Sequence, residues 1–447
     1  MSPAAANASN APVAADKNTA EAQWSEIHVS DTRRYTLFWV VAEKASRLLT
    51  GAFVTAAVAR YLGPTEYGSL SVAAGVVAIA VATAGLGAQH IELSELSRRS
   101  RSDAAAFMGS ALAVRAVWAL FCFAALIGAT YALNISHENL VLILSAGVLA
   151  VPPGIIGGRI QSQGQFATFS ILAFSSNIVG ALLRIAGILF AVPLTYFAVA
   201  YAAEACFFSL LLIVWQRRAE HSSLHRLSFA MTEASSYFRL CIPTAASITL
   251  VIVYFRVELF LIDFLIGKAA AGIWAASLMF TAPWGIVASS IVPFANRRLV
   301  MIQADERRYR HELAVLLRQM YMFACFAIVV NILAVKMLAP LLLGDKYAAV
   351  ADIVAIGSFS LLALFSGSVQ ELWIAHNRST GTVLKKVMIS LPVSIALYFM
   401  IVPRFGLLGA AGAMVISHFV TTLLLNVVLD RGFFRVQLHS FGILRTP

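Results

Sequence analysis

Charged residues are scarce in this chain. Asp, Glu, Lys and Arg make up 12% of its 447 residues, and hydrophobic residues make up 60%. Soluble domains carry about 25% charged residues, so a soluble protein of this length would have too few charged side chains to hydrate its surface. Part of the surface must face lipid, which excludes a cytosolic enzyme and a disordered chain. The net charge of +11 does not indicate a nucleic-acid partner, because most basic residues sit in short gaps between apolar runs rather than on a wet face.

The sequence also lacks motifs for metals, disulfides and nucleotides. Its cysteines lie far apart inside apolar stretches, at Cys122, Cys206, Cys241 and Cys325. No Cys-x-x-Cys or Cys/His ligand spacing occurs, and no G-x-x-x-x-G-K-[ST] loop for ATP. His221 and His225 are four residues apart but lie in a polar stretch without cysteine, which favours a solvated pair. We therefore expect no cofactor, no metal and no enzymatic activity.

What the chain has is a succession of apolar runs separated by short polar gaps. We place them at 36–61, 69–91, 104–132, 139–162, 167–191, 194–216, 239–266, 272–295, 314–338, 349–374, 384–402 and 407–430. A helix needs about 20 residues to cross the hydrocarbon core, and most of these runs qualify. The expected fold is an all-α integral membrane protein with about twelve transmembrane helices.

The distribution of Lys and Arg predicts the orientation of these spans. If the N-terminus is cytoplasmic, 22 of the 33 basic residues flank the cytoplasmic ends of the spans, 5 flank the opposite ends and 6 lie inside spans. Because cytoplasmic loops carry the excess of Lys and Arg, we expect both termini to be cytoplasmic.

The pattern divides the chain into two transmembrane lobes with polar segments around them. The expected parts are a disordered cytoplasmic tail (1–34), a six-helix lobe (35–216), a cytoplasmic linker (217–238), a second six-helix lobe (239–430) and a cytoplasmic tail (431–447). Residues 1–34 contain no apolar core of a secretory signal peptide. The loops are too short for a folded extramembrane domain, which needs at least about 50 residues.

A weak internal repeat supports this division. Gly63 and Gly68 share their spacing with Gly267 and Gly272, 204 residues later. Each pair falls at the outer end of the first span of a six-span block. An even number of spans per half gives a parallel repeat, in which both halves have the same orientation. Transporters commonly place the substrate between such halves, near the midplane of the membrane.

Charges inside the spans are the best candidates for a functional site. An ionisable group at the bilayer centre costs roughly 2.5–3.5 kcal/mol, so it normally faces a partner or a water-filled cavity. The candidate substrate-binding residues are Arg47, Arg115, Arg184 and Arg256, and the candidate coupling residues are Glu43, Glu204, Glu258 and Asp263. With Lys44 and Arg318 counted, the spans hold two more cations than anions, or one more if Glu371, at a span boundary, is counted. Permanent structural pairs, such as Glu43 with Arg47, are the alternative interpretation.

A surplus of cations predicts an anionic substrate. The planar fork of Arg bonds two oxygens at once, which suits phosphate, so the cavity would fit a pyrophosphate. One of the carboxylates Glu204, Glu258 and Asp263 would bind a proton or Na⁺ in the return step. The membrane potential acting on a cationic cavity is the alternative driving force.

Prolines interrupt two of the expected spans. Pro152-Pro153-Gly154 lies in the fourth, and Pro283-Trp284-Gly285 in the eighth. Since an internal proline removes a backbone hydrogen bond and bends the axis, these helices could line a cavity that opens to each side in turn.

Four segments, in order along the chain, resemble the polysaccharide flippases of the O-antigen (Wzx) type. Residues 59–68 (Ala-Arg-Tyr-Leu-Gly-Pro-Thr-Glu-Tyr-Gly) resemble the Ala-Arg-x-Leu-Gly-Pro-x-x-Tyr-Gly signature at the end of the first helix. Residues 262–276 resemble its counterpart in the second half, where Tyr is more usual than Trp274. Residues 343–347 (Leu-Gly-Asp-Lys-Tyr) resemble the loop after the ninth helix, and residues 403–412 the entry to the last helix.

This resemblance implies the fold of the multidrug/oligosaccharidyl-lipid/polysaccharide exporter superfamily, with two six-helix lobes around a V-shaped cavity. It implies a flippase that carries undecaprenyl-pyrophosphate-linked oligosaccharide from the inner to the outer leaflet of a bacterial inner membrane, for lipopolysaccharide or exopolysaccharide biosynthesis. Membrane lipids, a polysaccharide polymerase and export machinery are the partners it implies. The family has no short invariant motif, so the site residues rest on the charges.

Two other functions remain open at this stage. A drug–cation antiporter of the same superfamily would place acidic residues in the cavity without a surplus of arginine. A polytopic glycosyltransferase or polymerase would need an outer loop that positions catalytic groups, and the outer loops are short.

Overall fold

The computed structural model describes residues 34–99, 101–132, 137–222, 227–302, 304–377 and 380–441. Within these ranges every regular element is helical, as the apolar runs predict. The tail expected over 1–34 lies, apart from Arg34, outside the described residues.

The helices follow the order of the apolar runs. The chain enters a helix at residue 34 and passes through the π-helical turn η1 (Thr50–Val54). The first half continues with α2 (Thr55–Ala84), α3 (Gln89–Arg98), α4 (Arg101–Ala132), α5 (Glu138–Leu144), α6 (Ala146–Leu149), α7 (Gly154–Ser162), α8 (Phe166–Leu189) and α9 (Leu194–Ser222). The second half has α10 (Met231–Ile266), α11 (Lys268–Met301), α12 (Glu306–Leu343), η2 (Asp345–Tyr347), α13 (Val350–Gly357), α14 (Ser360–His376), α15 (Thr380–Phe419), η3 (Val420–Leu424), α16 (Leu425–Leu429) and α17 (Arg431–Ser440).

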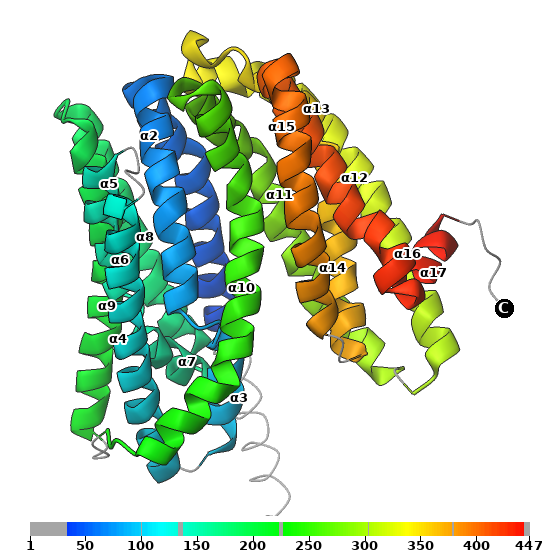
Figure 1. Cartoon of the computed structure of the whole chain (residues 1–447). Coiled ribbons are helices and arrows are strands. Elements are labelled where there is room, and N and C mark those ends of the chain that lie inside the picture. The colour runs from blue at the N-terminus through cyan, green and yellow to red at the C-terminus, as the bar shows by residue number, and fades with distance from the viewer. Residues whose placement is uncertain are drawn as a thin grey trace, which may run out of the picture.

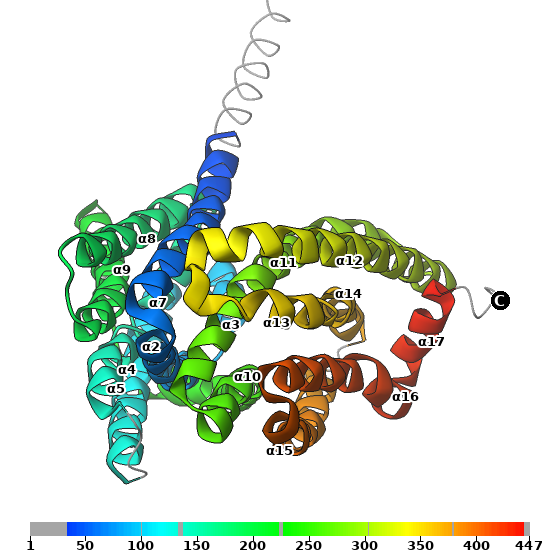
Figure 2. The ribbon, with the colours of Figure 1, turned by 90° about the horizontal axis from the view of Figure 1, so that it is seen from above.

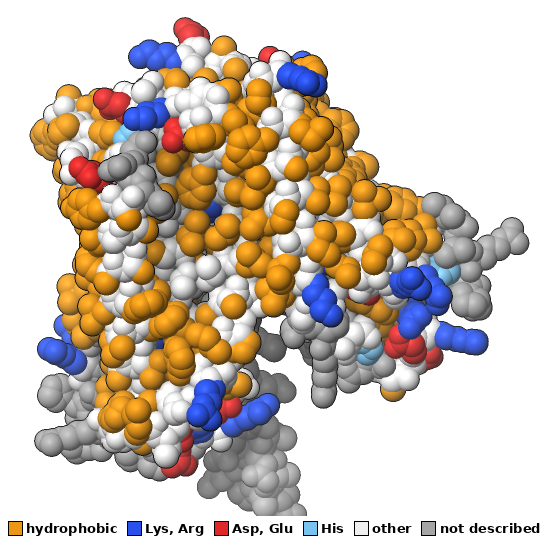
Figure 3. All heavy atoms as spheres, in the orientation of Figure 1, with side chains coloured by type: hydrophobic (Ala, Val, Ile, Leu, Met, Phe, Trp, Pro, Cys, Tyr) orange, Lys and Arg blue, Asp and Glu red, His pale blue; other side chains and the backbone are white. Residues whose placement is uncertain are grey.

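Eight helical segments of the described chain are long and apolar enough to cross a membrane, or nine if the bent pair Asp345–Gly357 and Ser360–His376 forms one span. Two of the eight, Arg34–Ala84 and Gly381–Leu429, are about twice the length of a single span. Figure 3 shows why lipid suits this surface: hydrophobic side chains cover the middle, and most charged side chains lie toward the two ends.

The helices form two groups that approach at one end of the molecule and diverge at the other (Figure 1). Helices up to α9 make one group and α11 to α17 the other. Seen from above, α2, α10 and α11 lie where the two groups meet (Figure 2). The end where the groups approach carries the turns at Gly63, Gly267, Gly344 and Gly406, and we call it the glycine end.

Two glycines of the repeat adopt the same backbone conformation. Gly63 has φ 75° and ψ 170°, and Gly267 has φ 91° and ψ 174°. Side chains disfavour this positive-φ region, whereas glycine enters it without a steric penalty. Each glycine ends one long helix and begins the next, so the shared spacing reflects a shared turn.

The second glycines of the repeat bring two helices into backbone contact. A Cβ atom on Gly68 in α2 would lie 2.0 Å from the carbonyl oxygen of Lys268, and a Cβ atom on Gly272 in α11 would lie 1.9 Å from that of Pro64. Each glycine thus faces the carbonyl four residues before the other, as a pseudo-twofold arrangement requires. Small residues permit such an approach.

Polar contacts join the two groups beside this crossing. The Arg60 guanidinium donates to the carbonyl of Leu341 at 2.9 Å, and the buried Tyr347 hydroxyl donates to the carbonyl of Ala59 at 2.8 Å. The residues that resemble the flippase signature therefore meet those that resemble the loop after the ninth helix.

The proline clusters behave differently from each other. Pro152 and Pro153 lie in the predicted break, between the end of α6 at Leu149 and the start of α7 at Gly154. By contrast, α11 runs as one helix through Pro283, so the interruption predicted there is wrong. Membrane helices tolerate an internal proline because neighbouring groups can satisfy the freed backbone carbonyl.

The polar segments predicted around the lobes are more helical than the sequence indicates. Within 217–238, α9 extends to Ser222 and α10 already begins at Met231. Within 431–447, α17 occupies Arg431–Ser440 and buries Phe433 and Val436. The Asp430 side chain caps α17 by accepting from the backbone N–H of Phe433 at 3.2 Å, which fixes its start.

Substituting Gly68 tests the crossing. We expect Gly68→Ala to lower the melting temperature of the purified protein, at a cost of about 1–3 kcal/mol or more, because the new methyl group meets a carbonyl that cannot rotate away. Gly128→Ala in α4 is the matched control, since no atom lies within 4 Å of its added Cβ and alanine favours a helix. If Gly68→Ala melts no lower than the control, the contact does not hold the halves together.

Candidate functional site

A cavity of about 420 Å³ opens between the two groups of helices, next to the glycine crossing. We call it the central cavity. Its walls are the first helix with η1, Thr55 and the part of α2 from Tyr67 onward, Tyr201 of α9, and the facing turns of α10 and α11. Small and aromatic residues dominate the lining: among them are Gly51, Ala52, Tyr67, Ala74, Phe255, Trp274, Ala275 and Ala282.

Arg47 and Arg256 are the charged residues of this lining, and no carboxylate occurs among the described residues that form it. Arg47 comes from the first helix and Arg256 from α10, so each half contributes one. Both are exposed. Within the described part of the chain, Arg256 has no hydrogen-bond or ion-pair partner. The central cavity is therefore cationic.

A second cavity of about 470 Å³ adjoins the first and shares Arg47, Gly51, Thr55 and Tyr201 with it. We call it the side cavity. It lies within the first half, between the first helix, α8 and α9, and it is lined by polar groups as well as Ala173, Ala205 and Phe208.

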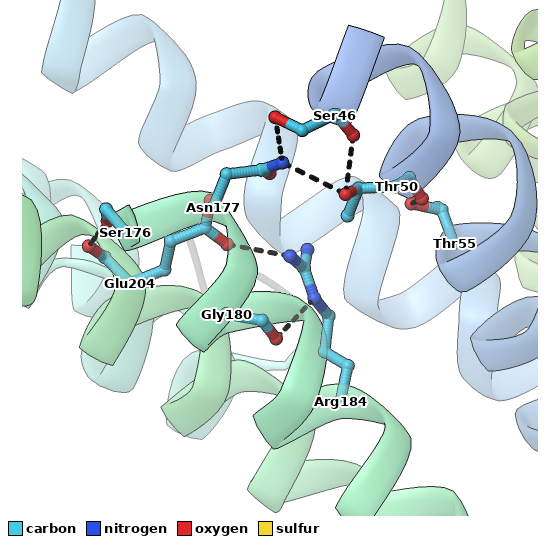
Figure 4. A network of polar contacts seen from close by, with 8 residues as sticks. All are labelled: Ser46, Thr50, Thr55, Ser176, Asn177, Gly180, Arg184 and Glu204. Atoms are coloured by element: carbon cyan, nitrogen blue, oxygen red, sulfur yellow. Dashed lines mark hydrogen bonds and ion pairs between the residues drawn. The ribbon is translucent and has the colours of Figure 1, made fainter. Parts of the chain in front are cut away.

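A network of polar contacts forms one wall of the side cavity (Figure 4). Asn177, Gly180 and Arg184 follow one face of α8, because residues three or four apart lie above one another on a helix. The Asn177 amide donates to the hydroxyl oxygens of Ser46 at 3.1 Å and Thr50 at 3.0 Å. These bonds tie α8 to the first helix just beside Arg47.

Arg184 is fully engaged within this network. It donates to the Glu204 carboxylate at 2.8 Å and to the Gly180 carbonyl at 2.9 Å, and its guanidinium lies 4.6 Å from the centre of the Tyr201 ring. Only 4% of the side chain is exposed, against 25% for Glu204. Arg184 lines the cavity, but its charge is already neutralised.

Arg47 lies between two carboxylates. It forms an ion pair with Glu43, one turn earlier on the same face, and it also interacts electrostatically with Glu204. Its side chain is 56% exposed while that of Glu43 is 12% exposed. The guanidinium is therefore balanced by acids on the protein side and open on the cavity side.

Arg115 is the exception among the four predicted arginines. It lines neither cavity and is buried, with its guanidinium 2.7 Å from Glu92. The Tyr237 hydroxyl donates to the same carboxylate at 2.6 Å. Arg115 also donates to the carbonyl of Val151 at 3.3 Å, which accepts from the Gly154 N–H at 3.0 Å as well. Its contacts tie α4 to α3, α10 and this break.

Glu92 was not among the candidates because the second span was predicted to end at residue 91. Including Glu92 lowers the surplus of intramembrane cations by one, and Glu371, which lies in α14, lowers it by one more. Arg47, Arg115 and Arg184 each have a carboxylate partner, and Arg256 is the one of the four that lacks one among the described residues.

Aromatic residues of the cavity were also missed. Tyr67 lies within electrostatic reach of Arg256, and the indole N–H of Trp274 has no hydrogen-bond partner among the described residues. Both belong to segments quoted for their resemblance to the flippases. Their position one residue before Gly68 and two after Gly272 could have placed them beside the crossing.

The remaining acidic candidates lie away from the central cavity lining. Glu258 is 5% exposed, and its carboxylate is 3.8 Å from Nε2 of His418 on α15. Asp263 lies within electrostatic reach of His137 and Lys268, and one of its oxygens is buried without a partner in the described structure. The assignment of a coupling ion to Glu43, Glu204, Glu258 or Asp263 stays a prediction.

Comparison of structures relates the fold to known transporters. The lipid II flippase MurJ, in an inward closed conformation, is similar with a TM-score of 0.71 and 15% identity over 91% of each chain. An inward-facing multidrug resistance MATE family transporter of the MOP superfamily has a TM-score of 0.59 and 13% identity, over 91% of this chain and 95% of that one. At such identities the likeness shows the fold alone, which is the exporter-superfamily fold expected from the sequence.

Comparison of sequences identifies a relative and the family of the chain. The capsular polysaccharide biosynthesis protein CapF of Staphylococcus aureus is 25% identical over 228 residues, which cover 50% of this chain and 57% of that relative. The chain thus spans little more than half the length of this curated relative. A family model described as polysaccharide biosynthesis protein matches residues 57–352, from the signature segment to α13. The chain belongs to the polysaccharide biosynthesis protein family.

Proposed function

We propose that this protein is a flippase that moves undecaprenyl-pyrophosphate-linked oligosaccharide from the inner to the outer leaflet of a bacterial inner membrane by alternating access. One observation carries the proposal: Arg47 and Arg256, one from each half, are both exposed to a central cavity whose described lining has no carboxylate. The family and the fold support transport in polysaccharide biosynthesis.

The pyrophosphate is the part of the substrate that these arginines would recognise. Each guanidinium can bond two phosphate oxygens with charge-assisted hydrogen bonds. Tyr67 and Trp274 border the same cavity from α2 and α11, but both side chains are buried, so they shape it rather than donate to the ligand in this conformation. Because the site draws on both halves, a movement of the halves would change the distance between its two cations.

The carboxylates around Arg47 lower the cost of an empty cavity. When no substrate is bound, Glu43 balances Arg47 at the membrane interior. A pyrophosphate would replace Glu43 as the partner of Arg47, so the Arg47 guanidinium has an anionic partner at every step. Arg184 has a different role in this proposal: it holds Glu204 beside Arg47 and positions the wall that carries Asn177.

The side cavity is suited to the saccharide. It begins at Arg47, and its lining includes the hydroxyl of Thr50, the amide of Asn177 and the carboxylate of Glu204. Such groups form hydrogen bonds with sugar hydroxyls. A phosphate bound by Arg47 would bring the first sugar to its mouth.

The antiporter alternative is less consistent with these charges. An organic cation in the central cavity would face Arg47 and Arg256 with no anion in the described lining. The MATE-like fold alone does not favour it, because one fold serves many functions. No observation in the described structure supports the glycosyltransferase or polymerase alternative.

We also propose twelve spans, two six-helix lobes and cytoplasmic termini. The two longest candidate segments contain non-helical residues at Gly63 and Gly406, so each divides into two spans. Dividing these two segments turns the eight candidate segments into ten spans. The bent pair counts as the eleventh span and α10 as the twelfth. The glycine end would then face outward and the diverging end the cytoplasm, as in an inward-facing transporter.

Substitutions at the two arginines test the substrate site. In a strain whose own copy is deleted, Arg47→Ala or Arg256→Ala should abolish most export, and lipid-linked repeat units should accumulate on the cytoplasmic face. Losing a charge-assisted bond weakens binding by roughly tenfold or more. Arg47→Lys should be impaired, because it keeps the charge but loses the two-oxygen geometry. Lys44→Ala, one position from Glu43 and outside both cavity linings, should export normally.

The double variant Glu43→Gln with Arg47→Met separates binding from folding. If the ion pair only supports the fold, neutral groups of similar size should replace it without loss. Normal membrane abundance without export is the result we expect. Normal export by this variant would refute the assignment of Arg47.

Reporter fusions test the topology. Fusions after Ser136 and Lys268 should report the periplasm, and those after Arg99 and Arg308 the cytoplasm, because the basic residues cluster on the second set of loops. A cytoplasmic signal after Lys268 would contradict six spans in the first half.

A further inference from the structure

A second basic cavity, of about 680 Å³, lies far from the glycine end, between the start of α12 and α17. We call it the basic cleft. Its charged and titratable lining residues are Arg307, Arg308, Arg310, His311, Arg435 and His439, with Asp305 and Glu306. Figure 3 shows basic, acidic and histidine side chains gathered at this end of the molecule, next to the hydrophobic surface.

The two acids of the cleft are already engaged. Asp305 caps α12 by accepting from the backbone N–H of Arg308 at 3.1 Å. Glu306 pairs with Arg310 at 2.6 Å and lies 3.5 Å from His376. In the described structure, the guanidinium groups of Arg307, Arg308 and Arg435 have no ion-pair partner. The cleft therefore has an excess of positive charge.

The position of these arginines adds to that excess. Arg307 and Arg308 lie in the first turn of α12, a helix of 38 residues. The N-terminal end of a helix carries a partial positive charge, which disfavours cations and favours a bound anion. Arg307 and Arg308 add to this positive end beyond what Asp305 and Glu306 offset, so the cleft favours an anion.

α17 brings Arg435 to the same cleft from another part of the chain. Its buried residues Phe433 and Val436 pack into a core that also contains Tyr309 and Leu313 of α12. Asp430 further anchors its start by accepting from the indole N–H of Trp373 at 3.0 Å. The cleft is thus formed by two helices with a fixed packing rather than by a loose loop.

The surface of α12 indicates that the anion belongs to a lipid. Arg308 and His311 lie on the helix face that continues along the span, past the exposed Arg318 and Gln319, with exposed apolar residues. These are Val315, Met322, Phe326, Val329, Leu333 and Met337. These exposed apolar residues recur at helical spacing, which places them on one side of α12 as a lipid-facing stripe. The basic cleft is therefore at the polar end of a stripe that contacts acyl chains, where phospholipid headgroups lie.

We propose that the basic cleft binds the phosphate of an anionic phospholipid of the surrounding leaflet. The phosphate lies between the start of α12 and Arg435 of α17, and the acyl chains follow the apolar stripe of α12. This site is separate from the substrate cavity and does not depend on the proposed flippase function.

Lipid binding to the purified full-length protein tests this proposal. Native mass spectrometry would measure binding of dioleoylphosphatidylglycerol and of dioleoylphosphatidylcholine, whose choline group offsets the phosphate charge. The cleft variant is Arg307→Gln with Arg435→Gln. The control is Arg217→Gln with Arg218→Gln, which removes the same charge from two exposed arginines near the end of α9. Matching melting temperatures would show that both variants are folded.

We expect wild-type protein to prefer phosphatidylglycerol, the cleft variant to bind it roughly tenfold more weakly, and the control to bind like wild type. Inorganic phosphate at millimolar concentration should not displace the lipid. Equal weakening in both variants would show that general surface charge attracts lipid, and an unchanged cleft variant would show that no such site exists. Full competition by inorganic phosphate would mean a site for soluble anions. Each of these three results overturns the proposal.

Discussion

The contact between the backbones of α2 and α11 determines where the cavity can be. Gly68 and Gly272 each face a carbonyl of the opposite helix, at a distance that excludes any side chain. The residues that follow these glycines, from Leu70 on α2 and Trp274 on α11, line the central cavity. The halves therefore meet at one end and separate just below it. In the proposed flippase, small rotations about this contact would change the width of the cavity.

The cost of intramembrane charge explains how the site is organised. Three of the four candidate arginines have carboxylate partners, but their side chains differ in how far they are exposed to a cavity. Arg115 is buried against Glu92 and also donates to the Val151 carbonyl beside the proline break. Arg184 is buried against Glu204 and positions the wall of the side cavity. Arg47 is paired but open to the cavity, and Arg256 is open with no partner in the described structure. Only these last two have charge available for a ligand.

Much of this arrangement could be predicted from the sequence. The apolar runs predict the helices in order, and the spacing of Gly63 and Gly68 against Gly267 and Gly272 predicts a repeat, whereas the crossing of α2 and α11 is seen only in the structure. Because charges inside a membrane are costly, Arg47, Arg184 and Arg256 were expected at a cavity, and they line two adjoining ones. Arg115 lies outside both linings and pairs with Glu92, which lies one residue beyond the predicted end of the second span because span ends are uncertain by a few residues. Tyr67, Tyr201 and Trp274 come from three helices, and no local pattern says which aromatic residues meet across a bundle.

The most direct test of the account is the position of the diphosphate in a cryo-electron microscopy map of the protein in lipid nanodiscs with undecaprenyl pyrophosphate. The account predicts density for the diphosphate between the guanidinium groups of Arg47 and Arg256, with the Glu43–Arg47 ion pair broken. Diphosphate density that contacts neither arginine, with the ion pair intact, would contradict it.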